Sequence, residues 1–102
     1  MKVLKFGGSS VATIEKIQSI AAYLKERAKQ EKMVVVVSAM GKTTNHLIEL
    51  AHAISANPNQ RELDRLLSIG EQQTIALLAM ALWEIEVPAV SLTAYQVGIR
   101  IT

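Results

Sequence analysis

Two short apolar runs and an amphipathic stretch between them dominate the first third of the chain. Residues 3–6 and 33–37 are apolar runs of strand length, each stopped by glycine or serine, and we predict both as buried strands. Between them, apolar residues recur every three or four positions and predict a helix over about 13–30, with Thr13 as its N-cap. A strand, a helix and a strand in this order form a βαβ unit with parallel strands. The pattern therefore predicts the α/β class.

Two further helices are expected in the middle of the chain. Asn45 is the predicted N-cap of the first, which ends at residues 57–59 because the proline there disfavours helical backbone in the residue before it. A longer apolar periodicity predicts a helix over 61–83. Gly70 interrupts it at a cost of roughly 1 kcal/mol relative to alanine, so we expect a break or a kink there.

Two further apolar runs lie at the carboxyl end of the sequence. Residues 89–92 predict a third buried strand, and residues 99–101 predict the start of a fourth. Parallel strands with their helices would leave an open sheet edge, which complete domains usually cover. We therefore expect the chain to be part of a larger architecture.

Composition narrows the class of protein. The 102 residues, 50% hydrophobic and 20% charged, allow one small globular domain. The 11 Lys and Arg and 9 Asp and Glu are interspersed without a basic stripe, so no nucleic-acid partner is expected. The lack of cysteine excludes disulfides and thiol catalysis and favours the cytoplasm. The sequence contains neither a signal peptide nor the ~18 uninterrupted apolar residues of a membrane span, so no membrane partner is expected.

A glycine-rich segment follows the first predicted strand. Residues 5–10 read Lys-Phe-Gly-Gly-Ser-Ser and precede a helix, at the sheet edge where open α/β sheets bind ligands. Gly7 and Gly8 would let the backbone approach a phosphate, and Lys5 would add positive charge. A phosphate site is one interpretation, and a simple glycine turn beside a solvated lysine is the other.

A second polar loop, Ser-Ala-Met-Gly-Lys-Thr-Thr over residues 38–44, follows the second strand. It is not a P-loop, because the glycine required five positions before Gly41 is replaced by Val36, inside the strand. The hydroxyl groups of Ser38 and Thr44 suit hydrogen bonds to a carboxylate or an amine. Ordinary capping of the next helix is the alternative.

A third candidate is Glu71, which follows the costly Gly70 in an apolar helix. Such a glycine beside a charge suggests the close approach of backbone or ligand, whereas an exposed glutamate at a helix start is the alternative. His46 and His52 lie six positions apart, off the spacing of one helix face, so we predict no metal site. Three polar residues near the last strand have no predicted role: Tyr95, Gln96 and Arg100.

Four blocks together resemble the amino-terminal part of the aspartokinases, within the amino acid kinase family: residues 5–11, 34–44, 70–72 and 96–99. The resemblance covers essentially the whole chain. It implies an αβα sandwich around a mainly parallel sheet. It also implies transfer of the ATP γ-phosphate to the β-carboxylate of L-aspartate, giving 4-phospho-L-aspartate, the first step toward lysine, threonine and methionine.

The resemblance also implies roles for individual residues. The ATP phosphate site would comprise Lys5, Phe6, Gly7, Gly8 and Ser9, with Lys5 as the catalytic residue that stabilises charge on the transferred group. The aspartate site would comprise Ser38, Thr44 and Glu71, with the Glu71 carboxylate pairing with the substrate ammonium. Mg²⁺ would bridge the nucleotide phosphates, and no metal ligand from the protein is expected.

On the same resemblance, residues 1–102 are the amino-terminal part of the catalytic domain. A nucleotide-binding half and ACT regulatory domains would lie outside it, and the full-length protein is expected to be a homo-oligomer. These 102 residues alone are expected to be inactive. Two alternatives remain, namely another member of the amino acid kinase superfamily with a different acceptor, and a non-catalytic binding module that retains a kinase-like fold.

Overall fold

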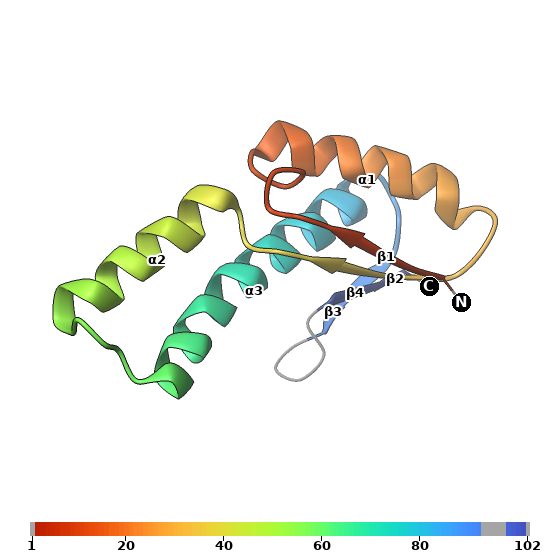
Figure 1. Cartoon of the computed structure of the whole chain (residues 1–102). Helices are drawn as coiled ribbons and strands as arrows, with labels where there is room; N and C mark the ends of the chain where they lie inside the picture. The colour runs from red at the N-terminus through yellow and green to blue at the C-terminus, as the bar shows by residue number, and fades with distance from the viewer. Residues whose placement is uncertain (1, 93–97, 102) are drawn as a thin grey trace.

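The computed structural model describes residues 2–92 and 98–101 of the chain. Its elements follow in the order β1 (Lys2–Phe6), α1 (Ile14–Ala28), β2 (Met33–Val37), α2 (Gly41–Ile54), α3 (Gln60–Glu84), β3 (Ala89–Leu92) and β4 (Gly98–Ile101). The predicted α/β class is therefore confirmed (Figure 1). Tyr95 and Gln96, whose roles were left open, lie outside the described residues.

The strands form a single sheet in the order β1-β2-β4-β3. β1 and β2 are parallel, with Lys5 opposite Val36 in the register. β4 lies between β2 and β3 and is antiparallel to both. Three strands therefore run in one direction, as expected of a mainly parallel sheet, and the fourth is inserted between them in reverse.

The core lies between one face of this sheet and the two helices α1 and α3, which pack side by side (Figure 1). Alternate residues of β2 are buried beneath the helices, at Met33, Val35 and Val37. The buried residues of the two helices are Ile17, Ile20, Ala21 and Leu24 in α1, and Gly70, Thr74, Ile75, Leu78 and Leu82 in α3. Each large apolar side chain buried in this way contributes about 1.5–3 kcal/mol to the free energy of unfolding.

The prediction that β1 is a buried strand is wrong. β1 is an edge strand that pairs with β2, and Val3 is 56% exposed. Leu4 and Phe6 pack against the core, whereas Val3 and Lys5 alternate with them and so lie on the opposite face of the sheet. Both described helices that cover the sheet, α1 and α3, lie on the same face. Residues 89–92 were likewise predicted to be a buried strand, yet Val90 and Ser91 of β3 are exposed.

α1 begins as predicted. Thr13 caps it, and its side-chain oxygen accepts a hydrogen bond from the backbone N–H of Lys16 at 3.2 Å. α2 begins five residues earlier than predicted, at Gly41, so Asn45 is not its N-cap. Met40 occupies the N-cap position, and no side chain among the described residues caps this helix end. The helix starts earlier than predicted because the chain passes from β2 into α2 after residues 38–40, and no polar side chain is needed to begin it.

α3 runs without interruption through Gly70, so the predicted break is wrong. Gly70 is buried, and a Cβ added there would lie 2.9 Å from the Cβ of Ala39. The glycine is required because neighbouring segments pack directly against the helix, and its propensity cost is offset by that packing. The close approach expected at this glycine is made by side chains of the second loop and α2 rather than by backbone.

By length and composition alone, α3 could cross a membrane. Its buried face, however, packs on the sheet through Leu78 and Leu82, as expected of the central helix of an α/β core. The helix ends in a Schellman motif in which the Val87 N–H donates to the Leu82 carbonyl at 2.8 Å and Glu86 adopts a φ of 65°. The indole N–H of Trp83 donates to the Ala89 carbonyl at 2.8 Å and so fixes the corner between α3 and β3.

α2 and the first half of α3 form a helical hairpin that extends beyond the sheet (Figure 1). The molecule is accordingly elongated, with extents of 48 × 26 × 17 Å. All residues of α2 are described, and none is buried. Its only large contact with another helix is with α3, which makes the contact at Gly70 decisive for its position.

Candidate functional site

The glycine-rich segment forms a tight turn at the carboxyl end of β1. The Ser10 N–H donates to the Gly7 carbonyl at 3.0 Å, which leaves Gly8 and Ser9 as the central residues of the turn. Within the described residues, the backbone N–H groups of Gly8 and Ser9 donate to no protein acceptor. Exposed amides of this kind suit an anion.

The two glycines of the turn have different surroundings. A Cβ added to Gly8 would lie 3.2 Å from the carbonyl oxygen of Ala39, so the second loop packs against this glycine. A Cβ added to Gly7 would meet nothing within 4 Å. The Ser38 N–H also donates to the Phe6 carbonyl at 3.1 Å, which joins the ends of the two strands. The two predicted loops therefore meet at one edge of the sheet, and the space over Gly7 is open.

The amino-terminal end of α2 points its backbone N–H groups toward this edge. The Gly41 nitrogen lies 4.0 Å from the position that a Gly8 Cβ would occupy. Thr43 and Thr44 donate to the Met40 carbonyl at 3.0 and 3.2 Å, whereas no side chain caps the helix end among the described residues. The first turn carries no acidic residue, so the positive end of the helix dipole is not neutralised.

This helix end is a feature that the sequence analysis missed, because Asn45 was taken as the cap. The available signal was the absence of Ser, Thr, Asp or Asn immediately before Gly41, since most helices place a capping side chain there. By contrast, α1 and α3 are capped by Thr13 and Asn59.

Glu71 is brought to the second loop by the packing of its neighbour. A Cβ on Gly70 would lie 3.3 Å from the Thr43 Cγ2 atom as well as against Ala39. Glu71 is the next residue of α3 and is half-buried, and Thr44 in the first turn of α2 is half-buried as well. Ser38 is exposed at the end of β2. The three predicted substrate residues thus belong to segments that pack together at this edge.

Lys5 lies two residues before the glycine turn, exposed on the sheet face opposite the helices. His46 and His52 are exposed on α2. Among the described residues, no group of three or more histidine or acidic side chains could hold a metal ion.

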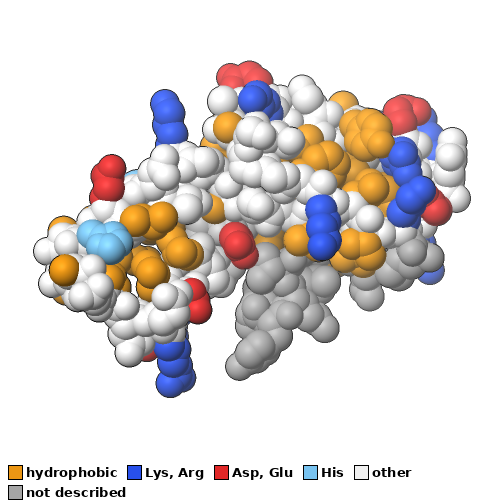
Figure 2. All heavy atoms as spheres, viewed as in Figure 1, with side chains coloured by type: hydrophobic (Ala, Val, Ile, Leu, Met, Phe, Trp, Pro, Cys, Tyr) orange, Lys and Arg blue, Asp and Glu red, His pale blue; other side chains and the backbone are white. Residues whose placement is uncertain are grey.

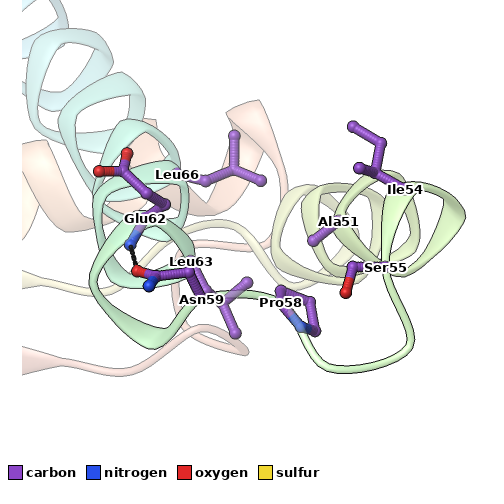
Figure 3. A pocket seen from close by; sticks show the side chains of 8 residues that line it. All are labelled: Ala51, Ile54, Ser55, Pro58, Asn59, Glu62, Leu63 and Leu66. Carbon is purple, nitrogen blue, oxygen red and sulfur yellow. Dashed lines mark hydrogen bonds between the residues drawn. The ribbon is translucent and has the colours of Figure 1, made fainter.

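A separate cavity of about 220 Å³ lies near the tip of the hairpin, between the end of α2 and the start of α3 (Figure 3). Its lining is mainly apolar and comprises Ala51, Ile54, Ser55, Pro58, Asn59, Glu62, Leu63 and Leu66. Asn59 caps α3 at its rim, accepting a hydrogen bond from the Glu62 N–H at 3.2 Å. The 14 residues of α2 separate it from the glycine turn by about 20 Å. This cavity is therefore not part of the candidate site.

The surface seen in Figure 2 agrees with the charge pattern of the sequence. Lysine and arginine side chains are scattered over this face, and hydrophobic side chains are visible both on the hairpin at the left and on the other half of the molecule at the right. Among the exposed apolar residues of α2, Ile54 is 90% exposed.

The described part of the chain is thus an α/β domain with three of its four strands in one direction, and a glycine turn and an uncapped helix end lie at the carboxyl edge of its sheet. The family model of the amino acid kinase family matches residues 1–101, and the chain belongs to this family.

Its relatives include aspartokinase 2 of Bacillus subtilis (strain 168), 56% identical over 96% of this chain, and the aspartokinase of Geobacillus stearothermophilus, 57% identical over 95%. The aspartate kinase structure from Synechocystis is 55% identical and superimposes with a TM-score of 0.89 over 93% of this chain. The chain spans 24% of the length of these two curated relatives and 16% of the Synechocystis chain. The predicted family and fold class are confirmed by these likenesses.

Proposed function

We propose that this chain is the part of an aspartate kinase that holds the transferred phosphoryl group and the amino-acid substrate. The proposed reaction converts ATP and L-aspartate into ADP and 4-phospho-L-aspartate, the entry to lysine, threonine and methionine synthesis. It is supported by the similarity to aspartokinases over 95% or more of the chain. The observation that carries it is the approach of the Gly8 turn to the uncapped start of α2, with Gly70, the neighbour of Glu71 in α3, packed against the same loop.

In this proposal, the residues at the glycine turn bind the phosphates of ATP. The free N–H groups of Gly8 and Ser9 and the amino-terminal end of α2 donate to phosphate oxygens, and Lys5 supplies a full positive charge. Phe6 ends β1 and packs on the core, which fixes the strand from which the turn begins. Phosphoryl transfer needs little covalent participation by the protein, so such donors and their positions account for most of the catalysis.

The second loop and α3 would hold L-aspartate. The hydroxyl groups of Ser38 and Thr44 donate to its α-carboxylate, and the Glu71 carboxylate accepts from its ammonium group. The β-carboxylate then remains free to face the phosphates. One of its oxygens forms the new bond to the γ-phosphorus, while the bond from that phosphorus to the bridging oxygen of ADP breaks.

ATP enters such sites as its Mg²⁺ complex, and the ion neutralises charge on the phosphate oxygens. Mg²⁺ at phosphate sites is commonly held by the phosphates and one or two carboxylates. The donors at the glycine turn are N–H groups and an ammonium group, which fit phosphate oxygens rather than a cation. We therefore propose that the nucleotide itself is contacted by Lys5, Gly7, Gly8 and Ser9. We also propose that the enzyme is cytoplasmic and homo-oligomeric, without a membrane or nucleic-acid partner.

The test uses the complete reading frame that contains this chain, incubated with MgATP, L-aspartate and hydroxylamine. Hydroxylamine converts an acyl phosphate into a hydroxamate that is measured by colour. We expect hydroxamate with aspartate. Loss of the ion pair in Glu71→Gln should raise the KM for aspartate by on the order of 100-fold.

The matched control is Glu84→Gln, an exposed residue at the other end of the same helix, which should behave as wild type. ADP formation without hydroxamate would indicate a different acceptor and contradict the aspartate assignment. A Glu71→Gln enzyme with an unchanged KM for aspartate would remove that residue from the site.

A further inference from the structure

Lys16, in the first turn of α1, contacts the glycine turn in a way that the proposed function does not use. Its ammonium Nζ donates a hydrogen bond to the Ser9 carbonyl oxygen at 2.9 Å. The two residues are seven positions apart and belong to different segments, so the contact joins α1 to the turn.

This contact fixes the orientation of a whole peptide unit. The Ser9 carbonyl and the Ser10 N–H belong to the same planar peptide group. The Ser10 N–H donates to the Gly7 carbonyl at 3.0 Å, and Lys16 holds the carbonyl at the other side of the plane. A peptide held at both of its polar groups cannot rotate without breaking one of the two bonds. The partial negative charge of the Ser9 carbonyl is also neutralised by a full positive charge.

Lys16 itself extends from a rigid base. Its backbone N–H donates to the Thr13 side chain at 3.2 Å, and the Ile17 N–H donates to the Thr13 carbonyl at 3.0 Å. The Ile17 side chain is buried in the core. The start of α1 is therefore anchored, so the ammonium group holds the turn in a defined position rather than following it.

We propose that Lys16 is a positioning residue that orients the glycine turn so that its N–H groups face the phosphates of a nucleotide. This inference rests on the proposed function for the identity of the nucleotide, and on the two bonds to the Ser9–Ser10 peptide for the mechanism. Lys16 acts through the turn, whereas Lys5 would act on the phosphates directly.

The test compares Lys16→Met and Lys16→Arg in the complete reading frame, with Lys25→Met as a control on the same helix. Lys16→Met should raise the KM for MgATP about tenfold, the size of one lost hydrogen bond to a charged group, and leave the KM for aspartate within twofold. Lys16→Arg keeps the donor and should restore the KM for MgATP to within about threefold of wild type. The midpoint of thermal unfolding should be the same for all variants.

A binding measurement keeps this test independent of the reaction. Calorimetric titration with inorganic tripolyphosphate should show about tenfold weaker binding to Lys16→Met than to wild type or Lys25→Met. An unchanged affinity and an unchanged KM for MgATP would overturn the role of Lys16. A lower unfolding midpoint with equal rises in both KM values would also overturn it, because that result indicates a structural role. Weaker tripolyphosphate binding by Lys16→Met in a protein that forms no hydroxamate would contradict the proposed function while supporting the role of Lys16.

Discussion

The helices α1 and α2 both follow a parallel strand at the same edge of the sheet, yet they are built differently. α1 has a polar N-cap and an acidic residue in its first turn, and it buries four residues against the core. α2 begins at Gly41 without a side-chain cap or an acidic residue in its first turn, and none of its 14 described residues is buried. The first helix stabilises the fold, whereas the second leaves its polar groups free.

The difference is the one expected if α1 serves stability and the start of α2 serves the proposed binding of an anion. A capping oxygen or an acidic side chain at the start of α2 would stabilise the helix. The capping oxygen would, however, accept the hydrogen bonds of the N–H groups that an anion needs, and the acidic side chain would repel the anion. Natural proteins break local rules of this kind mainly at functional sites. The uncapped start of α2 therefore supports the location of the proposed phosphate site independently of the glycine turn.

The largest effect is expected from a substitution at Gly70, where α3 packs against the second loop and α2. In Gly70→Ala, the new Cβ would lie 2.9 Å from the Ala39 Cβ, so α3 must move away from the second loop. Displacements of about 1 Å at a site can reduce activity by on the order of 100-fold, and we expect that loss in kcat/KM for aspartate. The exposed Gln73→Ala on the same helix is the control and should retain activity. Full activity of Gly70→Ala in the hydroxamate assay would show that this packing does not position the site.

A negative charge at the start of α2 should weaken nucleotide binding. Met40→Asp and Met40→Asn both introduce a capping side chain at the N-cap and lose the same partly buried methionine, so their difference isolates the charge. We expect the KM for MgATP to be about tenfold higher in Met40→Asp than in Met40→Asn. Steady-state kinetics at low ionic strength measures the ratio. Equal KM values would mean that no phosphate lies near this helix end.

The smallest expected effect concerns the cap of α1. Thr13→Ala removes the acceptor of the Lys16 N–H and should lower the free energy of unfolding by about 1 kcal/mol. Thr13→Ser retains the hydroxyl group and should be close to wild type. Urea denaturation measures the change in the free energy of unfolding. The expected loss would show that the cap of α1 stabilises the fold, in contrast to the uncapped start of α2. A Thr13→Ala protein as stable as wild type would contradict it.

The sequence was sufficient for the elements whose pattern is local. The strand β2 and the helix α1 follow from apolar spacing and from the cap at Thr13, and the glycine turn follows from its residues. The break predicted at Gly70 and the cap predicted at Asn45 failed for different reasons. At Gly70, the deciding contact comes from the second loop, which is distant in the sequence. At the start of α2, a helix end without a side-chain cap lacks the polar signal by which a helix start is located from sequence.

The sheet was only partly predictable for a related physical reason. A buried strand and an edge strand with apolar residues have similar sequences, so the exposure of Val3 depends on what covers it. The reversed direction of β4 is set by its pairing with β2 and β3, which local propensity does not encode. Within the site, the bond from Lys16 to Ser9 was equally inaccessible, because it depends on how the turn folds back on α1.

The corner between α3 and β3 has a spectroscopic consequence. Trp83 is the only tryptophan in the chain, and its indole N–H is bonded to the Ala89 carbonyl. Its emission therefore reports on this corner of the core, while far-UV circular dichroism reports on all three helices together. Following both signals during denaturation distinguishes unfolding of the α2–α3 hairpin from unfolding of the core, since unfolding of the hairpin would reduce the helical signal before the fluorescence changes.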